Sequence, residues 1–312
     1  MARILRDADL TELVDRRSAV DLMDAGFRAD AAGEVVTVPR VRSTAAGVSV
    51  AWLGAALPQR DLLGFRTYLF GASGVDRGDQ IVSLYRHSTT ELRALFLGRM
   101  LGAVRTGAAA VAAVRAAEPG LRALGVVGTG TQAREVVASA VAALPLDSIV
   151  VYSPRAAHRA AFRAWAASEL DRDVTLAEDV RNVVAAAPAV VLATSAETTI
   201  VTPEMLAEPR LVVSISAYRR PEVDGRLLDV ASTVWTDSVT QASAPGTLFE
   251  TDARRSKLAP LLDERRLEAL RDRRSSRFVF NTGAAWEETI LAESLCRAAE
   301  ARNVGIGLEL PG

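Results

Sequence analysis

The segment LGVVGTGTQAREVV at 124–137 joins an apolar run, a glycine-rich turn and a helix-forming run. Its turn has Gly128, Gly130 and Ala133 in the spacing G-x-G-x-x-A. The first glycine permits a tight turn, the second lets the backbone approach a pyrophosphate, and the small third residue lets the helix pack close to the strand. We therefore expect a dinucleotide-binding turn rather than a plain strand–helix corner. The other turn residues expected beside the cofactor are Thr129, Thr131 and Gln132.

The end of the next predicted strand, SIVVYS at 148–153, indicates which dinucleotide is bound. An acidic residue at this place accepts hydrogen bonds from the adenine ribose and favours NAD. This chain has Ser153 and Arg155 instead. A guanidinium can pair with a 2′-phosphate through two parallel hydrogen bonds. The pattern predicts NADP in preference to NAD; the alternative is that Arg155 is a solvent-exposed residue at the start of a helix.

The glycine turn lies in a region where strands and helices alternate. From residue 122 the predicted strands are LGVVG, SIVVYS, VTLA, AVVLAT, LVVSISA and TVWTDS. Helical segments separate most of them, which is typical of a Rossmann-type doubly wound parallel sheet. Residues 240–256 look like a loop, and the charged stretch 263–277 looks like a solvated helix face.

The first part of the chain has a different pattern. The spacing of apolar residues predicts a helix over 11–33, which Thr11 can cap. Short β-prone runs follow between residues 35 and 84, as in an antiparallel sheet. Residues 91–118 return to helical character, and a last helix over 284–302 is expected to pack on this part. These elements predict a second, α+β domain.

Composition excludes several classes of protein. The chain has 312 residues, a net charge of −1, and a charged N-terminal segment where a signal peptide needs an apolar core. A single cysteine, Cys296, leaves no internal disulfide, and with His87 and His158 as its two histidines we expect no two-histidine metal site. We expect a cytoplasmic protein that binds no metal, nucleic acid or membrane.

At RTGAAA (105–110), about twenty residues before GTGTQA (128–133), the chain resembles the ornithine cyclodeaminase/mu-crystallin family. Further segments share this resemblance: PRV (39–41), GFRT (64–67), AVVLATSA (189–196) and NTGAAWEE (281–288). The resemblance implies a substrate-binding and dimerisation domain of residues 1–115 with 281–312. It also implies a Rossmann domain of residues 116–280, a site between the two domains, and a homodimer joined through the N-terminal sheet.

The same resemblance assigns three arginines to the substrate site. Arg40 and Arg105 match family positions that bind the substrate carboxylate, a task that suits the planar guanidinium fork. Arg66 stands where the family normally has lysine. An arginine can hold a carboxylate but cannot readily release a proton, so proton transfer must come from another group.

A second departure lies after the strand LVVSISA. Cyclodeaminases of the family carry an aspartate there that handles the substrate amine, whereas this chain has Tyr218 at about that place. Tyr218, His87 or a water is therefore the expected proton relay, although a loop histidine with a structural hydrogen bond is the favoured interpretation of His87. The remaining residues expected near the nicotinamide or substrate are Thr106, Thr194, Ser195, Ser216 and Thr282.

These observations favour an NAD(P)H-dependent reductase of a 2-imino acid, either an imine reductase or an amino-acid dehydrogenase. The carboxylate would be held by Arg40, Arg66 and Arg105 while hydride passes between the nicotinamide and the C=N carbon. One alternative is a redox-neutral lyase like ornithine cyclodeaminase, for which the expected acid is missing. The other is a non-catalytic NADPH-linked small-molecule binding protein. The three arginines argue against it, because they suit an acidic substrate better than an apolar ligand.

Overall fold

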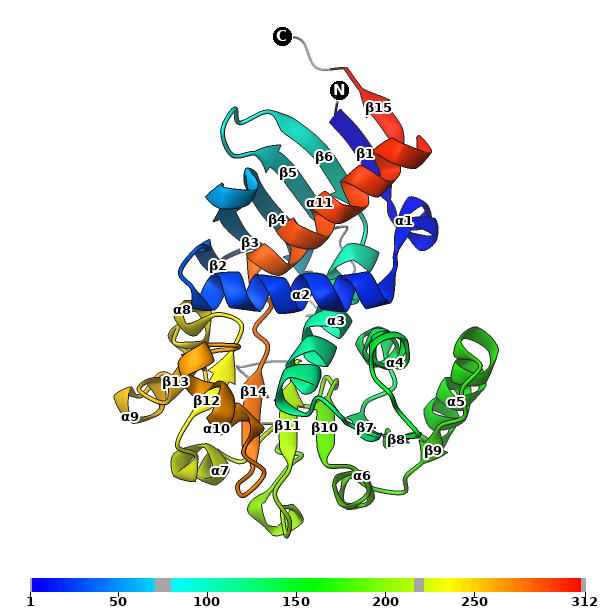
Figure 1. The fold of residues 1–312 in the computed structure, drawn as a ribbon, viewed down its shortest axis with the longest axis vertical. Helices are drawn as coiled ribbons and strands as arrows, with labels where there is room; N and C mark the ends of the chain where they lie inside the picture. The colour runs from blue at the N-terminus through cyan, green and yellow to red at the C-terminus, as the bar shows by residue number, and fades with distance from the viewer. Residues whose placement is uncertain (1, 71–79, 216–221, 310–312) are drawn as a thin grey trace. The chain divides into compact units, whose positions relative to one another are not determined.

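The computed structural model describes residues 2–70, 80–215 and 222–309 (Figure 1). The chain divides into two compact units, residues 1–105 with 284–312 and residues 106–283. The first boundary therefore lies inside helix α3 (Met100–Ala117), about ten residues before the predicted one. The physical reason is that α3 already packs on the second unit at Gly107, where an added Cβ atom would lie 2.5 Å from the backbone carbonyl carbon of Glu135.

A seven-stranded sheet forms the first unit, counted over the described residues, in the order β15-β1-β6-β5-β4-β3-β2. Strands β1 and β6 are parallel, and the β2–β3, β3–β4, β4–β5, β5–β6 and β1–β15 pairs are antiparallel. This confirms the antiparallel pattern expected between residues 35 and 84. The strands are β1 (Ala2–Arg6), β2 (Val36–Ala45), β3 (Val48–Leu57), β4 (Leu62–Phe70), β5 (Ile81–Arg86), β6 (Leu92–Leu97) and β15 (Ile306–Leu308).

Helix α11 (Ala285–Arg302) packs on this sheet, and helix α2 (Arg16–Ala31) packs on α11 (Figure 1). The single helix predicted over 11–33 is wrong at its start. A separate helix, α1 (Asp7–Leu13), comes first, and Thr11 lies inside it rather than capping it. Asp15 caps α2 instead, because its carboxylate accepts from the backbone N–H groups of Arg17 and Ser18.

The second unit contains an eight-stranded sheet, counted over the described residues, in the order β13-β12-β14-β11-β10-β7-β8-β9. Every strand pair in it is parallel. Its strands are β7 (Ala123–Val127), β8 (Ser148–Tyr152), β9 (Thr175–Leu176), β10 (Ala189–Leu192), β11 (Leu211–Ser214), β12 (Val234–Thr236), β13 (Leu258–Pro260) and β14 (Arg277–Phe280). The predicted Rossmann-type doubly wound sheet is confirmed.

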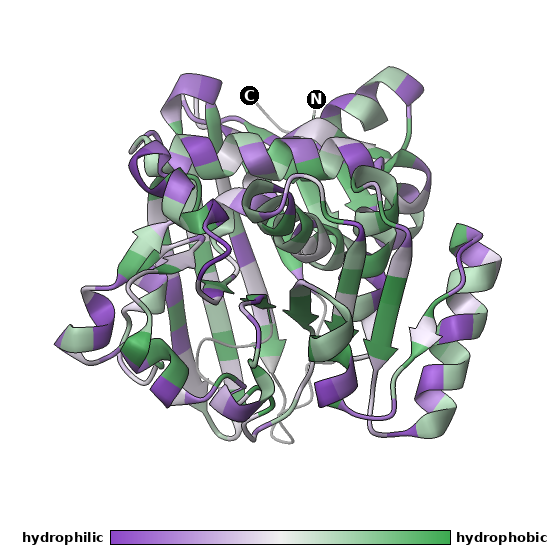
Figure 2. Ribbon diagram, turned by 60° about the horizontal axis from the view of Figure 1, so that its bottom comes forward, coloured by the Kyte–Doolittle hydropathy of each residue, from purple (hydrophilic) through white to green (hydrophobic). Residues whose placement is uncertain are grey.

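The direction of the crossovers places helices on both faces of this sheet. Helices α4 (Thr131–Ala143) and α5 (Ala156–Leu170) follow successive steps from β7 to β8 to β9. Helix α6 (Val180–Ala186) then returns the chain to β10 on the other side of β7. Because parallel crossovers are right-handed, this reversal puts α6 on the opposite face. Figure 2 shows largely hydrophobic strands between the helices, as a sheet covered on both faces requires.

The rest of the second unit is less regular than predicted. The expected loop at 240–256 contains two short helices, and the expected helix at 263–277 is helical only from Glu264 to Arg271. The remaining helices of the second unit are short: α7 (Gly225–Val230), α8 (Val239–Ala242), α9 (Asp252–Arg255) and α10 (Leu267–Arg271). This unit also has the 3-10 turns η2 (Pro203–Met205) and η3 (Glu264–Arg266), and the first unit has the 3-10 turn η1 (Pro58–Arg60). Among the described residues, only α3 is long and apolar enough to cross a bilayer, and 89% of it is buried, as in a core helix.

Candidate cofactor and substrate sites

The glycine turn joins β7 to α4 as predicted. Gly128 has φ +120°, a backbone conformation that side chains disfavour. A Cβ atom at Gly128 would lie 2.1 Å from the carbonyl oxygen of Ala193, just beyond the neighbouring strand β10. The backbone of Ala193 cannot easily yield, because its N–H donates to the Val127 carbonyl at 2.8 Å. The turn therefore requires glycine at this position.

The start of α4 is open for a phosphate. A Cβ atom at Gly130 would meet no atom within 4 Å. Gly130 is the N-cap residue, so no side chain caps the helix, and its first turn carries no acidic residue. Free N–H groups and the helix dipole at such an end favour an anion. Thr131 is the first helical residue and is exposed, whereas Gln132 has a buried Oε1 with no hydrogen-bond partner among the described residues.

The end of β8 brings the predicted adenosine-end residues together. Ser153 is buried and Arg155 is exposed at the N-cap position of α5. A further residue of this end, Arg159, was not singled out from the sequence. Its Nη1 donates to the Ser153 carbonyl at 2.5 Å, and its guanidinium lies 5.8 Å from the centre of the Tyr152 ring. Arg159 is therefore held against the backbone at the end of β8, whereas the side chain of Arg155 is exposed to solvent.

At the ends of β10 and β11, a buried carboxylate was missed in the sequence. The carboxylate of Glu222 accepts from Thr194 Oγ1 at 2.6 Å and from Ser214 Oγ at 2.9 Å. Thr194 Oγ1 also accepts from the backbone N–H of Ala196 at 3.0 Å. The hydroxyl proton of Thr194 is therefore committed to Glu222, so Thr194 can offer a ligand only its oxygen lone pairs. Ser195, its neighbour, is exposed.

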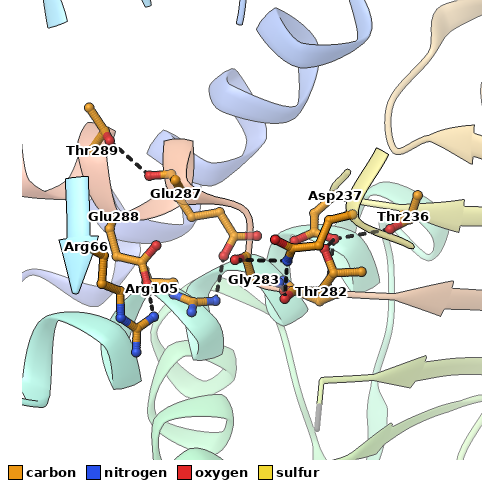
Figure 3. A network of polar contacts seen from close by, with 12 residues as sticks. Arg66, Arg105, Thr236, Asp237, Thr282, Gly283, Glu287, Glu288 and Thr289 are labelled. Carbon is orange, nitrogen blue, oxygen red and sulfur yellow. Dashed lines mark hydrogen bonds and ion pairs between the residues drawn. The ribbon is translucent and has the colours of Figure 1, made fainter. Parts of the chain in front are cut away.

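A second buried carboxylate organises the ends of β12 and β14 (Figure 3). Asp237 accepts from the Thr282 backbone N–H at 2.6 Å, from Thr282 Oγ1 at 2.7 Å and from Thr236 Oγ1 at 3.1 Å. Gln241 Nε2 donates to the Thr282 carbonyl at 2.7 Å. The backbone and hydroxyl of Thr282 are therefore both fixed by side chains of the second unit, which limits its predicted role toward a ligand.

The first unit gathers the arginines that were assigned to the substrate. Along β4, Gly64, Arg66 and Tyr68 are buried, while the alternate residues face outward. A Cβ atom at Gly64 would lie 2.3 Å from Thr289 Oγ1, so α11 packs directly against β4 at this point. That approach brings Glu288, the residue before Thr289, against the guanidinium of Arg66. Arg66 Nη2 also donates to Gln80 Oε1 at 2.6 Å.

Arg105 of α3 joins the same cluster (Figure 3). Its Nε donates to Glu288 Oε1 at 2.7 Å and its Nη1 donates to Glu287 Oε2 at 2.7 Å. Both glutamates lie in the first turn of α11 and are at most 1% exposed. The positive end of the helix dipole stabilises carboxylates at this place. The two glutamates were not predicted as site residues, although NTGAAWEE was recognised as a family segment.

Arg40 and Tyr68 complete the cluster. The guanidinium of Arg66 lies 4.7 Å from the centre of the Tyr68 ring, and that of Arg40 lies 5.9 Å from it. Burial lowers the pKa of Arg66, and repulsion from Arg105 and Arg40 lowers it further, whereas attraction to Glu288 opposes the shift. The structure thus brings the three predicted arginines together and adds two carboxylates and an aromatic ring.

Other predicted residues lie elsewhere. His87 is exposed in the turn after β5 and follows Arg86, which pairs with Leu62, whereas Arg66 pairs with Val82. Four residues of strand, about 13 Å, separate these levels, so His87 lies away from the arginines along the strands, and its role as a proton relay stays a prediction. Thr106 is buried at the start of the second unit. The predicted residues Ser216 and Tyr218 lie outside the described residues.

Comparison with known proteins gives one family match. Residues 2–260 match the model of the ornithine cyclodeaminase/mu-crystallin family. No curated protein matches the chain.

Solved structures match the chain over nearly its whole length. The Δ(1)-pyrroline-2-carboxylate reductase of Thermococcus litoralis, solved with NADH and L-proline, has a TM-score of 0.85 at 18% identity, covering 98% of this chain and 100% of that one. An archaeal alanine dehydrogenase dimer with bound NAD has a TM-score of 0.85 at 18% identity, covering 99% of each chain. A lysine cyclodeaminase that recognises L-lysine, L-ornithine and L-2,4-diaminobutyric acid has a TM-score of 0.82 at 26% identity, covering 99% of this chain and 96% of that one.

Proposed function

We propose, from the premise that the chain belongs to the ornithine cyclodeaminase/mu-crystallin family, that it is an NAD(P)H-dependent reductase of a 2-imino acid. The glycine turn and the open start of α4 support binding of a nicotinamide dinucleotide. Similar folds are found in solved enzymes that bind NADH or NAD. The substrate would be a carboxylate with a C=N bond beside it, formed from an amine and a 2-oxo acid or closed into a ring.

One observation in the arginine cluster carries the proposal. Arg66 Nε and Glu288 Oε2 are both buried and have no hydrogen-bond partner among the described residues. A buried donor or acceptor without a partner costs about 1–3 kcal/mol, so a ligand that satisfies both is favoured. A protonated imino acid supplies a carboxylate oxygen for Arg66 Nε and an N–H for Glu288 Oε2. The cluster therefore suits a substrate that has both charges.

The residues of the chain then bind and orient the substrate. Arg66, Arg105 and Arg40 hold the carboxylate, and Glu288 stabilises the positive charge on the neighbouring nitrogen. When bound, the reduced dinucleotide supplies the hydride that turns the C=N carbon into the CH–NH carbon of an amino acid. A protonated imine brings its own proton, so the hydride step needs no proton from Arg66. Positioning is the main contribution of the protein to such a step.

A redox-neutral cyclodeaminase is the second candidate, and a specific observation favours it. Glu287 and Glu288 supply acids beside the arginines, where the sequence offered none at the expected place. The lysine cyclodeaminase is also similar in sequence as well as fold. Incubation with ornithine or lysine and NAD or NADP separates the candidates. Ammonia release without net change in the dinucleotide would establish the lyase, and its absence is expected for the reductase.

We infer that NADP is preferred to NAD because Arg155 is exposed at the end of β8. Replacing Arg155 by alanine is expected to raise the Kd of NADPH by about tenfold or more, since a hydrogen bond to a charged group contributes about 1.5–3 kcal/mol. The Kd of NADH should change less than about twofold. Isothermal titration calorimetry measures both. Arg122→Ala is the matched control, because Arg122 is an exposed arginine paired with Asp147 just before β7. Equal weakening of NADPH and NADH by Arg155→Ala would remove the argument.

We also propose that the chain forms a homodimer through the outer face of the β2–β5 strands. This face exposes large apolar side chains, and exposed patches of this kind mark protein interfaces. Phe65→Asp is expected to shift the protein from dimer to monomer in light scattering coupled to size-exclusion chromatography. Val230→Asp is the control, because Val230 is 82% exposed on α7. A Phe65→Asp protein that stays dimeric would exclude this face. The exposed residues are Val36, Val38, Val41, Val48, Trp52, Phe65, Leu69 and Ile81.

A further inference from the structure

Gln80 lies directly before β5 and contacts the arginine cluster through its side chain. Its Oε1 accepts from Arg66 Nη2 at 2.6 Å, and the residue is 8% exposed. A guanidinium can only donate hydrogen bonds, so the amide oxygen, not the amide nitrogen, must face Arg66. The backbone carbonyl of Gln80 accepts from the Gly98 N–H at 3.0 Å, which holds the main chain beside this contact. Gln80 is therefore a buried, neutral acceptor for one end of the guanidinium.

Helix α3 makes room for this contact at Gly102. A Cβ atom at Gly102 would lie 3.2 Å from both Arg66 Nη2 and Gln80 Oε1. A side chain at this position would therefore press on the hydrogen bond between the two residues. Glycine is a poorer helix former than alanine, so its place in α3 needs a reason. The passage of the Arg66–Gln80 hydrogen bond over the helix supplies that reason.

Three neighbours fix the orientation of the Arg66 guanidinium. Its Nη1 donates to Glu288 Oε1, its Nη2 donates to Gln80, and the centre of the Tyr68 ring lies 4.7 Å away. The remaining donor, Nε, is buried and has no hydrogen-bond partner among the described residues. A side chain that is already held in one orientation loses less entropy when a ligand binds. Gln80 therefore helps to hold Arg66 in the orientation that leaves Nε for a ligand.

Gln80 is also neutral, and this affects the charge that Arg66 presents. Glu288 Oε1 accepts from Arg105 Nε at 2.7 Å as well as from Arg66, so two guanidiniums share this carboxylate (Figure 3). A glutamate at position 80 could accept the same hydrogen bond from Arg66, but it would add a negative charge beside it. The amide of Gln80 accepts without adding charge. Arg66 thus keeps positive charge for a carboxylate that approaches its Nε.

We propose that Gln80 is a positioning residue that orients Arg66 toward the substrate carboxylate and, because it is neutral, makes the site selective for an anionic ligand. This inference rests on the carboxylate binding of the proposed function. It adds to the residue that binds the anion the residue that orients it. Gln80 was not singled out from the sequence, since it is 14 residues from Arg66 and its contact depends on the pairing of β4 with β5.

The test compares two ligands of similar shape, pyrrole-2-carboxylate and pyrrole-2-carboxamide. The first has a carboxylate beside a ring N–H, and the second has a neutral amide in place of the carboxylate. In Gln80→Glu the Kd of the carboxylate is expected to rise about tenfold or more, because the added negative charge repels it in a buried site. The Kd of the carboxamide should stay within about twofold. Isothermal titration calorimetry in the presence of NADP measures both. Gln59→Glu is the matched control, because Gln59 is exposed in η1 of the same unit.

Gln80→Met separates the orientation of Arg66 from the packing around it. Methionine is similar in size to glutamine but offers Arg66 no oxygen. The Kd of pyrrole-2-carboxylate should therefore rise from the unaltered protein to Gln80→Met, and rise further in Gln80→Glu. If Gln80 only stabilises the buried guanidinium, Gln80→Glu should bind the carboxylate as tightly as the unaltered protein does, because glutamate keeps the acceptor. That order of affinities would overturn the proposal.

The other outcomes are also distinct. Equal weakening of the two ligands in Gln80→Glu would show that residue 80 only shapes the site, and would overturn the proposal. If Gln80→Glu does not fold, Gln80→Met decides, since a lower preference for the carboxylate over the carboxamide supports the proposal and an unchanged preference overturns it. Failure of the unaltered protein to bind pyrrole-2-carboxylate would instead contradict the carboxylate site of the proposed function.

Discussion

Replacing Arg105 by methionine is expected to destabilise the protein by about 3–5 kcal/mol, the usual cost of removing one partner from a buried ion pair. The guanidinium neutralises Glu287 and shares Glu288 with Arg66. Methionine keeps the apolar part of the side chain but leaves the two buried carboxylates with one guanidinium fewer. At roughly 2–4 °C per kcal/mol, the melting temperature should fall by about 6–20 °C. Differential scanning calorimetry measures this change.

The double variant Arg105→Met with Glu287→Gln is the matched control for this expectation. Removing the charge of Glu287 should restore part of the lost stability, because the two residues interact directly. Turnover should stay absent in the double variant, since the substrate carboxylate still lacks Arg105. A loss below about 1 kcal/mol in the single variant would show that the ion pairs are not desolvated as described. Recovery of turnover with recovered stability would show that Arg105 has only a structural role.

Replacing Gly130 by alanine is expected to remove dinucleotide binding without loss of stability. Gly130 has φ −79°, and a Cβ atom there meets no protein atom within 4 Å, so alanine fits the free protein. The same Cβ would occupy the space above the start of α4 where a pyrophosphate approaches the backbone. The melting temperature should therefore stay unchanged while the Kd of NADPH rises by about a hundredfold or more, the loss of roughly two charge-assisted hydrogen bonds.

Gly128→Ala gives the contrasting result. At Gly128 the added Cβ would lie 2.1 Å from a backbone oxygen, so this variant should lose both stability and dinucleotide binding. The pair of variants thus separates a glycine required by the fold from one required by the ligand. Thermal unfolding and calorimetric titration of both variants measure the difference. A Gly130→Ala protein that binds NADPH as tightly as the unaltered protein would show that the turn is only a strand–helix corner.

The parallel sheet could be predicted because its signals are local. In the 122–236 region each strand, turn and helix is indicated by residues that are close together in the sequence. The alternating order of these elements then indicates a doubly wound sheet. The boundary between the units could not be predicted in the same way. It falls at Arg105 within one continuous helix, where no break in the helical pattern marks it.

The arginines could be predicted, but their partners could not. Arg105 and Glu287 are 182 residues apart, and only the packing of α11 on β4 brings the glutamates to the cluster. Glu222 is a similar case, since its contact with Thr194 spans 28 residues and joins two strand ends. The cap of α2 is different, because Asp15 followed by Ser18 is a local signal that was readable in the sequence and was overlooked.

The central claim is that the protein reduces a 2-imino acid. The loss of NADPH absorbance as the dinucleotide is oxidised tests this claim most directly. Purified protein would be assayed with cyclic ketimines and with 2-oxo acids mixed with ammonia or simple amines, and with NADH in parallel. Steady oxidation that depends on the imine is the predicted result, faster with NADPH than with NADH. No oxidation with any substrate, from protein that still binds NADPH, would contradict the account.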